Sequence, residues 1–260
     1  MATYLDKIVA HHRQRAAVDR RSLDDLIAQA RECAPARGFI RAIASESSSR
    51  LAVIAEIKRR SPSKGDLNVD LDAEVVARAY RDGGATCLSV LTDEPHFGGS
   101  TNDLRAARQA SGLPVIRKDF TVDPRDVCDA RIMGADCVLL IAAALSADEL
   151  SVMHGIADTI GIDVLVEIHD EVELEVAVAA HARMIGVNQR DLVTFKVDHE
   201  RAVRMAGVIP EGVVRVAESG VRGADDARSL RDAGYDAILV GESLVTSSDM
   251  VASLGALRVA

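Results

Sequence analysis

Eight short apolar runs, each followed by a loop and an amphipathic helical stretch, constrain the fold of this 260-residue chain more than any other feature. They are, in chain order, LAVIAEI, CLSVL, PVIRK, CVLLI, DVLVEI, MIGV, VVRVAE and AILV. Their centres lie about 20 to 35 residues apart, the length of one strand–helix unit. Strands that alternate with helices form a parallel sheet covered on both faces. The pattern predicts an α/β fold, either a (β/α)8 TIM barrel or a large open sheet.

Helix boundaries favour the barrel. Asp70 begins a helical stretch that stops at Gly83-Gly84, and Asp123-Pro124 opens another that ends at Gly134. A doubly wound open sheet would more often carry a glycine-rich dinucleotide loop after its first strand. In this chain KRRSPSKG follows the first run instead, so we expect a (β/α)8 barrel.

The length and the 48% hydrophobic content suit one large core, and no polar or Pro/Gly-rich linker interrupts residues 50–245. We therefore expect a single domain over residues 1–260, with the barrel in residues 48–260. Residues 1–47 show helical periodicity and are expected to be an N-terminal helical extension packed on the barrel. The alternative for this segment is a flexible tail.

Composition excludes several classes of function. A net charge of −9 and an aromatic content of 3% argue against nucleic acid as a partner. No apolar run approaches the ~20 residues that cross a bilayer, and the N-terminus turns polar too early for a signal peptide. The four cysteines and seven histidines have no metal-ligand spacing, so we expect buried, reduced thiols and no metal. These features predict a soluble cytoplasmic protein without a membrane partner.

Polar residues gather at the ends of the apolar runs, which is where TIM barrels carry their active sites. They are Glu56, Lys58, Lys118, Glu167, Asn188, Arg190, Glu218 and Ser219. Because side chains alternate along a strand, Glu56 and Lys58 should point to the same side. Buried charges cost several kcal/mol each unless they are paired or functional. Two lysines and three glutamates on four strand ends indicate an active site, with structural ion pairs as the alternative.

The last two βα loops carry a signal for phosphate. Ser219-Gly220 and Gly241-Glu242-Ser243 would expose backbone N–H groups at helix starts, where an anion is favoured. Barrels commonly bind phosphate at this position, although tight turns alone would also use these residues. Lys58 or Lys64 could complete the charge balance.

The ordered motifs AEIKRRSPSKG, SVLTDEPHFGGS, PVIRKDF, GADCVLLI, LVEIHD, IGVNQRDL, AESGV and LVGESLV resemble those of indole-3-glycerol-phosphate synthases. The resemblance covers about residues 51–245, and the N-terminal extension is also similar to that family's extra helices. Phosphoribosylanthranilate isomerase and the tryptophan synthase α chain share the barrel, but they lack the combination of EIK…SPSKG and RKDF.

The resemblance implies a catalytic set and a substrate-binding set. The implied catalytic residues are Lys118, Lys58, Glu167, Glu56, Asn188 and Glu218. The implied substrate-binding residues are Ser61, Phe120, Leu139, Arg190, Ser219 and Gly220, to which the phosphate signal adds Gly241 and Glu242. Gln189 and the segment 100–103 depart from the family pattern, which bears on substrate detail rather than on the reaction.

The reaction implied is ring closure of 1-(2-carboxyphenylamino)-1-deoxyribulose 5-phosphate to indole-3-glycerol phosphate, CO₂ and water in tryptophan biosynthesis, without metal or organic cofactor. Lys118 would protonate the ketone oxygen, and Lys58 with Glu56 or Glu167 would share the acid and base roles of the dehydration. We expect burial and mutual proximity to lower the pKa values of the two lysines.

Other groups would hold the substrate. Arg190 suits the substrate carboxylate or positions a glutamate, and Asn188 suits a sugar hydroxyl. Phe120, Leu139 and Pro62 would surround the anthranilate ring. His169 is the histidine expected nearest to this site.

Two other functions stay open from the residues alone. A lysine at a strand end could form a Schiff base in an aldolase-type barrel. A phosphate-ligand binding or assembly protein on the same fold is the non-enzymatic alternative. The expected partner is a small phosphorylated substrate, and we expect a monomer, with association with other tryptophan-pathway enzymes left open.

Overall fold

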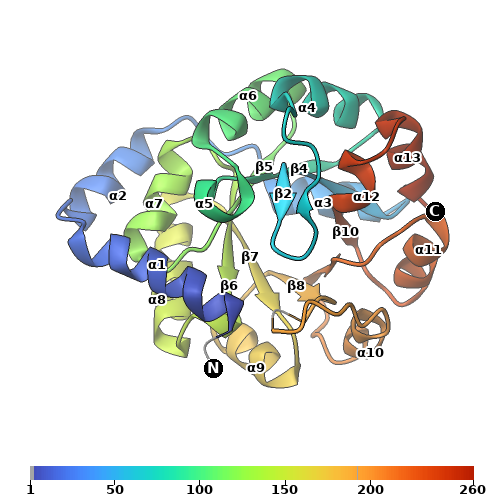
Figure 1. The fold of residues 1–260 in the computed structure, drawn as a ribbon. Helices are drawn as coiled ribbons and strands as arrows, with labels where there is room; N and C mark the ends of the chain where they lie inside the picture. Colours follow the sequence, from blue (N-terminus) through green and yellow to red (C-terminus); the bar gives the residue numbers. More distant parts are fainter. Residues whose placement is uncertain (1–2, 192) are drawn as a thin grey trace.

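Eight parallel strands close into a barrel in the computed structural model, which describes residues 3–191 and 193–260 (Figure 1). The strands are β1 (Ala52–Ile57), β4 (Cys87–Leu91), β5 (Val115–Lys118), β6 (Cys137–Ile141), β7 (Asp163–Ile168), β8 (Met184–Asn188), β9 (Val214–Glu218) and β10 (Ala237–Val240). They are hydrogen-bonded in the order β1-β10-β9-β8-β7-β6-β5-β4, and the ring closes through β1 and β4. The prediction of a (β/α)8 barrel is confirmed. Met1, Ala2 and the last residue of the IGVNQRDL motif, Leu192, lie outside the described residues.

Helices follow the strands and cover the barrel. The outer helices are α4 (Ala73–Asp82), α6 (Thr101–Ser111), α7 (Pro124–Ile132), α8 (Ala147–Ile160), α9 (Glu171–Ala179), α10 (Arg201–Ala206), α11 (Ala224–Asp232) and α13 (Met250–Leu257). Short helical turns α5 (Glu94–Phe97), η1 (Ala142–Ala144) and α12 (Glu242–Val245) lie in the loops. The expected start of α4 at Asp70 is wrong by two residues, because Asp72 is the residue whose carboxylate caps the backbone N–H groups of Glu74 and Val75.

Alternation along the strands produces two apolar layers. Val53, Ala55 and Ile57 of β1 pack outward against the helices, whereas Ala52 and Ile54 belong to the core inside the barrel. Every residue of β1 is buried, as expected for strands covered on both faces. The inner apolar layer fills the barrel towards the amino-terminal ends of the strands. Polar groups occupy the carboxyl ends.

The N-terminal extension is helical, as predicted, and consists of α1 (Tyr4–Val18), α2 (Leu23–Glu32) and α3 (Phe39–Ser47). Helix α3 closes the amino-terminal end of the barrel, because Phe39 and Ile43 are completely buried in the inner core. Its backbone is fixed there by the N–H of Ile40, which donates to the Asp163 carboxylate at 3.0 Å. Helix α2 packs on α7 and α8 along the outside (Figure 1). Helix α1 reaches the opposite end of the barrel.

Two local features were not predicted. A short hairpin of β2 (Arg60–Ser61) and β3 (Gly65–Asp66) lies in the loop after β1, where the strands are too short to leave a periodic signal. Cys33 is half-buried at the end of α2, so the expectation of buried thiols holds for the other three cysteines but is wrong for this one.

Within the described residues, no helix has both the length and the apolar character that a bilayer crossing requires.

Candidate active site

A cavity of about 570 Å³ opens at the carboxyl ends of the strands. Every residue of the predicted catalytic and substrate-binding sets lines this cavity, together with Pro62 and Lys64. His169 does not belong to the lining, although its Nε2 atom lies 3.9 Å from Glu167 Oε1. The strand-end argument therefore located the cavity.

Lys118 lies at the centre of the charged groups. Its Nζ atom donates to Glu167 Oε2 at 2.8 Å and to Glu218 Oε2 at 2.7 Å. Burial by itself lowers the pKa of Lys118, but the charges of Glu167, Glu218 and Glu56 outweigh it and raise the pKa above its ordinary value. The expectation of a lowered pKa is wrong for this lysine, because the sequence does not show how closely the carboxylates surround it.

The two carboxylates that share Lys118 have different environments. Burial raises the pKa of Glu167, but Lys118 and His169 lower it to about 2, and Asn188 Nδ2 donates to Glu167 Oε1 at 3.0 Å. Burial raises the pKa of Glu218 to about 7 against the effect of Lys118, and Glu167 adds to the increase. Glu218 Oε1 is buried without a hydrogen-bond partner among the described residues. Near neutral pH, Glu167 is therefore ionised, whereas Glu218 can gain or lose a proton.

Glu56 and Lys58 form a second pair on the same side of β1, as the alternation predicts. Lys58 Nζ donates to Glu56 Oε1 at 2.6 Å, and Ser89 Oγ donates to Glu56 Oε2 at 3.2 Å. Burial by itself raises the pKa of Glu56. The positive charges of Lys58 and Lys118 lower it by more than burial raises it, so the pKa lies below its ordinary value. This pair places a second ammonium group at the cavity wall.

Two glycines, one inside β8 and one directly after β10, make room for these carboxylates. A Cβ atom on Gly186 would lie 2.1 Å from Glu218 Oε1, and a Cβ atom on Gly241 would lie 2.7 Å from Glu56 Oε1. Gly241 was predicted for the phosphate loop, whereas Gly186 was not singled out. Its signal is an isolated glycine inside an apolar strand, which often marks the close approach of another group.

The loops after β9 and β10 form one end of the cavity. Ser219 and Gly220 have left-handed backbone conformations, with φ of 65° and 79°. Gln189 Nε2 donates to the Ser219 carbonyl at 2.8 Å and holds this turn. A left-handed serine is uncommon, and sequence reasoning did not anticipate this conformation or the role of Gln189.

Two cations lie beside these loops. Glu242 is 3.4 Å from Lys64 Nζ through Oε1 and 3.5 Å from Arg190 Nη2 through Oε2. Of the two lysines proposed to balance a phosphate, Lys64 is the one beside the loop after β10, because Lys58 is paired with Glu56. Arg190 also donates through Nη1 to the Phe195 carbonyl at 3.2 Å. This end combines backbone at the cavity wall with nearby cationic side chains, which suits a phosphate group.

The apolar end of the cavity lies across the barrel. In the closed ring, β5 is four strands from β9 and β6 is four strands from β10. Phe120 follows β5 and Leu139 is on β6, so both face the phosphate loops from the opposite side. Tyr4, Leu5 and Ile8 of α1 also line the cavity, and sequence reasoning missed them because no local pattern shows where α1 docks.

Among the described residues, the group with the spacing of metal ligands is His12, Asp93 and Asp119. The Asp119 carboxylate already accepts from Arg117 Nη2 at 3.0 Å and from the Phe120 N–H at 2.8 Å. Arg117 would repel a cation here, so these donors do not suit a metal.

A closed (β/α)8 barrel, with three buried glutamates and two partly buried lysines around one cavity at the carboxyl ends of its strands, defines a TIM-barrel enzyme. The indole-3-glycerol phosphate synthase family model matches residues 5–257. An indole-3-glycerol phosphate synthase of Rhodopirellula baltica is 44% identical over 98% of each chain. One of Paenarthrobacter aurescens is 48% identical over 95% of this chain and 92% of its own. The chain belongs to the indole-3-glycerol phosphate synthase family.

Solved structures with low sequence identity show the same fold. The 3-hexulose-6-phosphate synthase from Salmonella typhimurium has a TM-score of 0.63 at 14% identity, covering 80% of this chain and 96% of its own. Orotidine 5'-phosphate decarboxylase from Pyrococcus horikoshii has a TM-score of 0.59 at 14% identity, covering 79% and 96%. These similarities concern the barrel alone.

Proposed function

We propose that this chain acts as an indole-3-glycerol phosphate synthase, which closes the indole ring from 1-(2-carboxyphenylamino)-1-deoxyribulose 5-phosphate in tryptophan biosynthesis. The supporting observation is the position of Lys118, whose ammonium group donates to both Glu167 and Glu218. It lies in one cavity that has an apolar end and an end suited to a phosphate group. The elongated substrate has a benzoate ring at one end and a phosphate at the other. Its reacting ketone would then lie near the middle, beside Lys118.

In the first step, the ring carbon that carries the carboxylate attacks the ketone carbon, and the ketone oxygen takes a proton from Lys118. The raised pKa of Lys118 makes it a weak acid towards water. The new alkoxide is a stronger base than an amine, so the proton transfer is still favourable. Breakage of the bond to the carboxylate then releases CO₂ and returns its electron pair to the ring.

In the second step, water leaves. The hydroxyl group formed from the ketone departs with a proton from Lys58, and a base removes the proton from the neighbouring carbon to form the double bond of indole. We assign Glu167 as this base. Once Lys118 has given up its proton, Glu167 loses the main charge that holds its pKa down, so its basicity rises when it is needed.

The remaining groups would bind the substrate. The backbone at Ser219, Gly220 and Gly241, with Lys64 and Arg190 nearby, suits the phosphate. Phe120 and Leu139, together with Ser61 in the β2–β3 hairpin, would surround the ring end. Glu242 would orient the two cations beside the phosphate. No metal or organic cofactor enters these steps, and activity should persist in EDTA.

Replacement of Lys118 tests the mechanism. Lys118→Met should lower kcat by at least about 100-fold while the substrate still binds, because the general acid is lost. The measurement is the growth of indole fluorescence with purified protein in EDTA, with the exposed Lys196→Met as the matched control. Near-normal turnover by Lys118→Met would remove the general-acid assignment.

The charged state of Lys118 argues against the alternative function, an aldolase-type enzyme that forms a Schiff base. An amine must lose its proton before it attacks a carbonyl, and the carboxylates around Lys118 raise its pKa. Borohydride treatment in the presence of substrate should therefore leave no covalent label. The monomeric state, the cytoplasmic location and any association with other tryptophan-pathway enzymes stay predictions, which sedimentation and localisation experiments would test.

A further inference from the structure

Helix α1 is attached to the barrel by few buried side chains. Ile8 and His12 are the buried residues of this fifteen-residue helix, and the ion pair between Arg13 and Glu149 is partly exposed, with side-chain exposures of 42% and 35%. Exposed ion pairs contribute little to stability. The position of α1 over the end of the barrel therefore depends mainly on what Ile8 and His12 contact.

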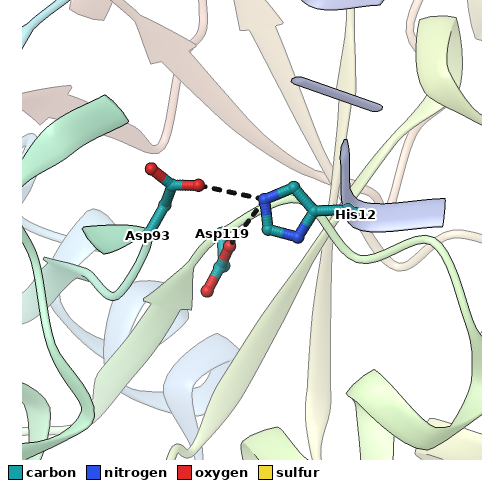
Figure 2. A group of neighbouring side chains, drawn as sticks. All are labelled: His12, Asp93 and Asp119. Carbon is teal, nitrogen blue, oxygen red and sulfur yellow. Dashed lines mark hydrogen bonds and ion pairs between the residues drawn. The ribbon is translucent and has the colours of Figure 1, made fainter. Parts of the chain in front are cut away.

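His12 contacts two carboxylates that come from different strands of the barrel (Figure 2). Its Nε2 atom lies 3.0 Å from Asp93 Oδ2 and 3.8 Å from Asp119 Oδ1. Asp93 caps α5 after β4, and Asp119 directly follows Lys118 at the end of β5. All three side chains are at least 96% buried. A helix-borne histidine is thus bound to the rim of the barrel, beside the proposed catalytic lysine.

The two carboxylates are held in place from their other sides. Asp93 accepts from the N–H and the ring Nδ1 of His96, at 2.7 and 3.1 Å. Asp119 accepts from Thr92, Arg117 and the Phe120 N–H. Their rigid geometry makes them a fixed receptor for the His12 ring. We call His12, Asp93 and Asp119 the α1 clasp.

The clasp lies next to the apolar end of the cavity. The ring of His12 is 5.6 Å from the ring of Phe120, centroid to centroid. From the same helix, Tyr4, Leu5 and Ile8 line the cavity, and the Tyr4 ring contacts the ring of Phe195 at 5.6 Å. A shift of α1 would therefore remove part of the apolar wall, whereas the loops after β9 and β10 lie across the barrel and, in the described part of the chain, make no hydrogen bond or ion pair with His12.

We propose that His12 is a positioning residue for the aromatic end of the substrate. By binding Asp93 and Asp119 it holds α1 where Leu5 and Ile8 close over the benzoate ring. The inference rests on the proposed function for the identity of that ring. It assigns to His12 an effect on the binding of the aromatic end, and not on the chemical step or on phosphate binding.

The test compares His12→Leu with His12→Gln and with Gln14→Leu, a change at an exposed position of the same helix. His12→Leu keeps apolar packing but cannot bind the carboxylates, so KM for the anilino substrate should rise about 10-fold or more, with kcat within about 3-fold of the wild type. Glutamine can still donate to Asp93 and should recover part of the loss. Gln14→Leu should leave both constants unchanged. Inorganic phosphate, used as a competitive inhibitor, should keep its inhibition constant within about 2-fold in every variant.

Other outcomes overturn the inference. An unchanged KM in His12→Leu, a loss confined to kcat, or an equal weakening of inorganic phosphate each contradicts selective positioning of the aromatic end. If His12→Leu does not fold, Leu5→Ala decides, because it removes wall contacts without touching the clasp and must reproduce the rise in KM. Product formation by the wild-type protein tests the proposed function separately, so the two failures are distinguishable.

Discussion

The carboxylate of Glu218 shows how environment, rather than residue type, determines chemistry in this cavity. Glu167 and Glu218 both accept from Lys118, but Glu167 also accepts from Asn188, whereas Glu218 Oε1 is unpartnered among the described residues. Burial therefore raises the pKa of Glu218 to about 7, while Lys118 and His169 hold that of Glu167 down against the same effect of burial. Two identical side chains thus differ in charge near neutral pH.

The stability of the protein should depend on pH through Glu218. Its pKa is higher in the folded state, so its contribution is fully present below the ordinary carboxyl pKa and is lost as pH rises through about 7. Relative to Glu218→Gln, the wild type should lose on the order of 2 kcal/mol of unfolding free energy between about pH 5 and about pH 8. Urea unfolding across this range measures the difference.

Glu211→Gln, at an exposed position, provides the control. Its unfolding free energy, plotted against pH, should stay parallel to that of the wild type. If the plot of unfolding free energy against pH for Glu218→Gln is also parallel to that of the wild type, Glu218 titrates as an ordinary carboxyl group and the prediction is wrong.

At the scale of elements, the loop after β9 places a strained residue at the proposed phosphate end of the cavity. Ser219 has a φ of 65°, a conformation that costs a non-glycine residue roughly 1–2 kcal/mol. Ser219→Gly should relieve this strain and keep KM within about 3-fold if the backbone N–H binds phosphate. Ser219→Leu should raise KM about 10-fold by filling the space. Steady-state kinetics on both variants makes the comparison, and an effect of Ser219→Leu on kcat alone would count against phosphate binding here.

The elements that sequence reasoning located share a strong local signal. All eight strands were predicted because apolar runs of four to seven residues recur with helices between them. Strand ends then identified the polar cavity. The β2–β3 hairpin and the exact start of α4 were missed, since very short strands and competing aspartate caps give weak signals.

The site features that were missed depend on tertiary structure. The docking of α1 and its clasp joins residues about 80 to 110 positions apart, which no local pattern encodes. The pKa of Lys118 was predicted in the wrong direction, because its sign depends on distances to three carboxylates from separate strands. Gly186 can be seen in the sequence as a lone glycine inside an apolar run. Its role could not be predicted, because it depends on the position of Glu218 on the neighbouring strand.

At the scale of the whole molecule, three of the four thiols report on global unfolding. Cys87, Cys128 and Cys137 are buried, and burial raises the pKa of each thiol, that of Cys128 to about 11. Only half-buried Cys33 should react rapidly with a thiol reagent in the native protein. The other three should react at the rate of unfolding, which absorbance measurements with and without urea would show. Rapid reaction of two or more thiols without denaturant would contradict this core.

The extension contacts both ends of the barrel, and this has a consequence for how the protein is made. Ile40 binds Asp163, which is 123 positions further along the chain, and Arg13 binds Glu149 at a separation of 136. The ribosome therefore releases α1 and α3 well before their binding surfaces have been synthesised. Contacts of such long sequence separation form slowly. The nascent helices must wait, with Phe39 and Ile43 unburied, until most of the strands exist, and this interval is when a chaperone would bind them.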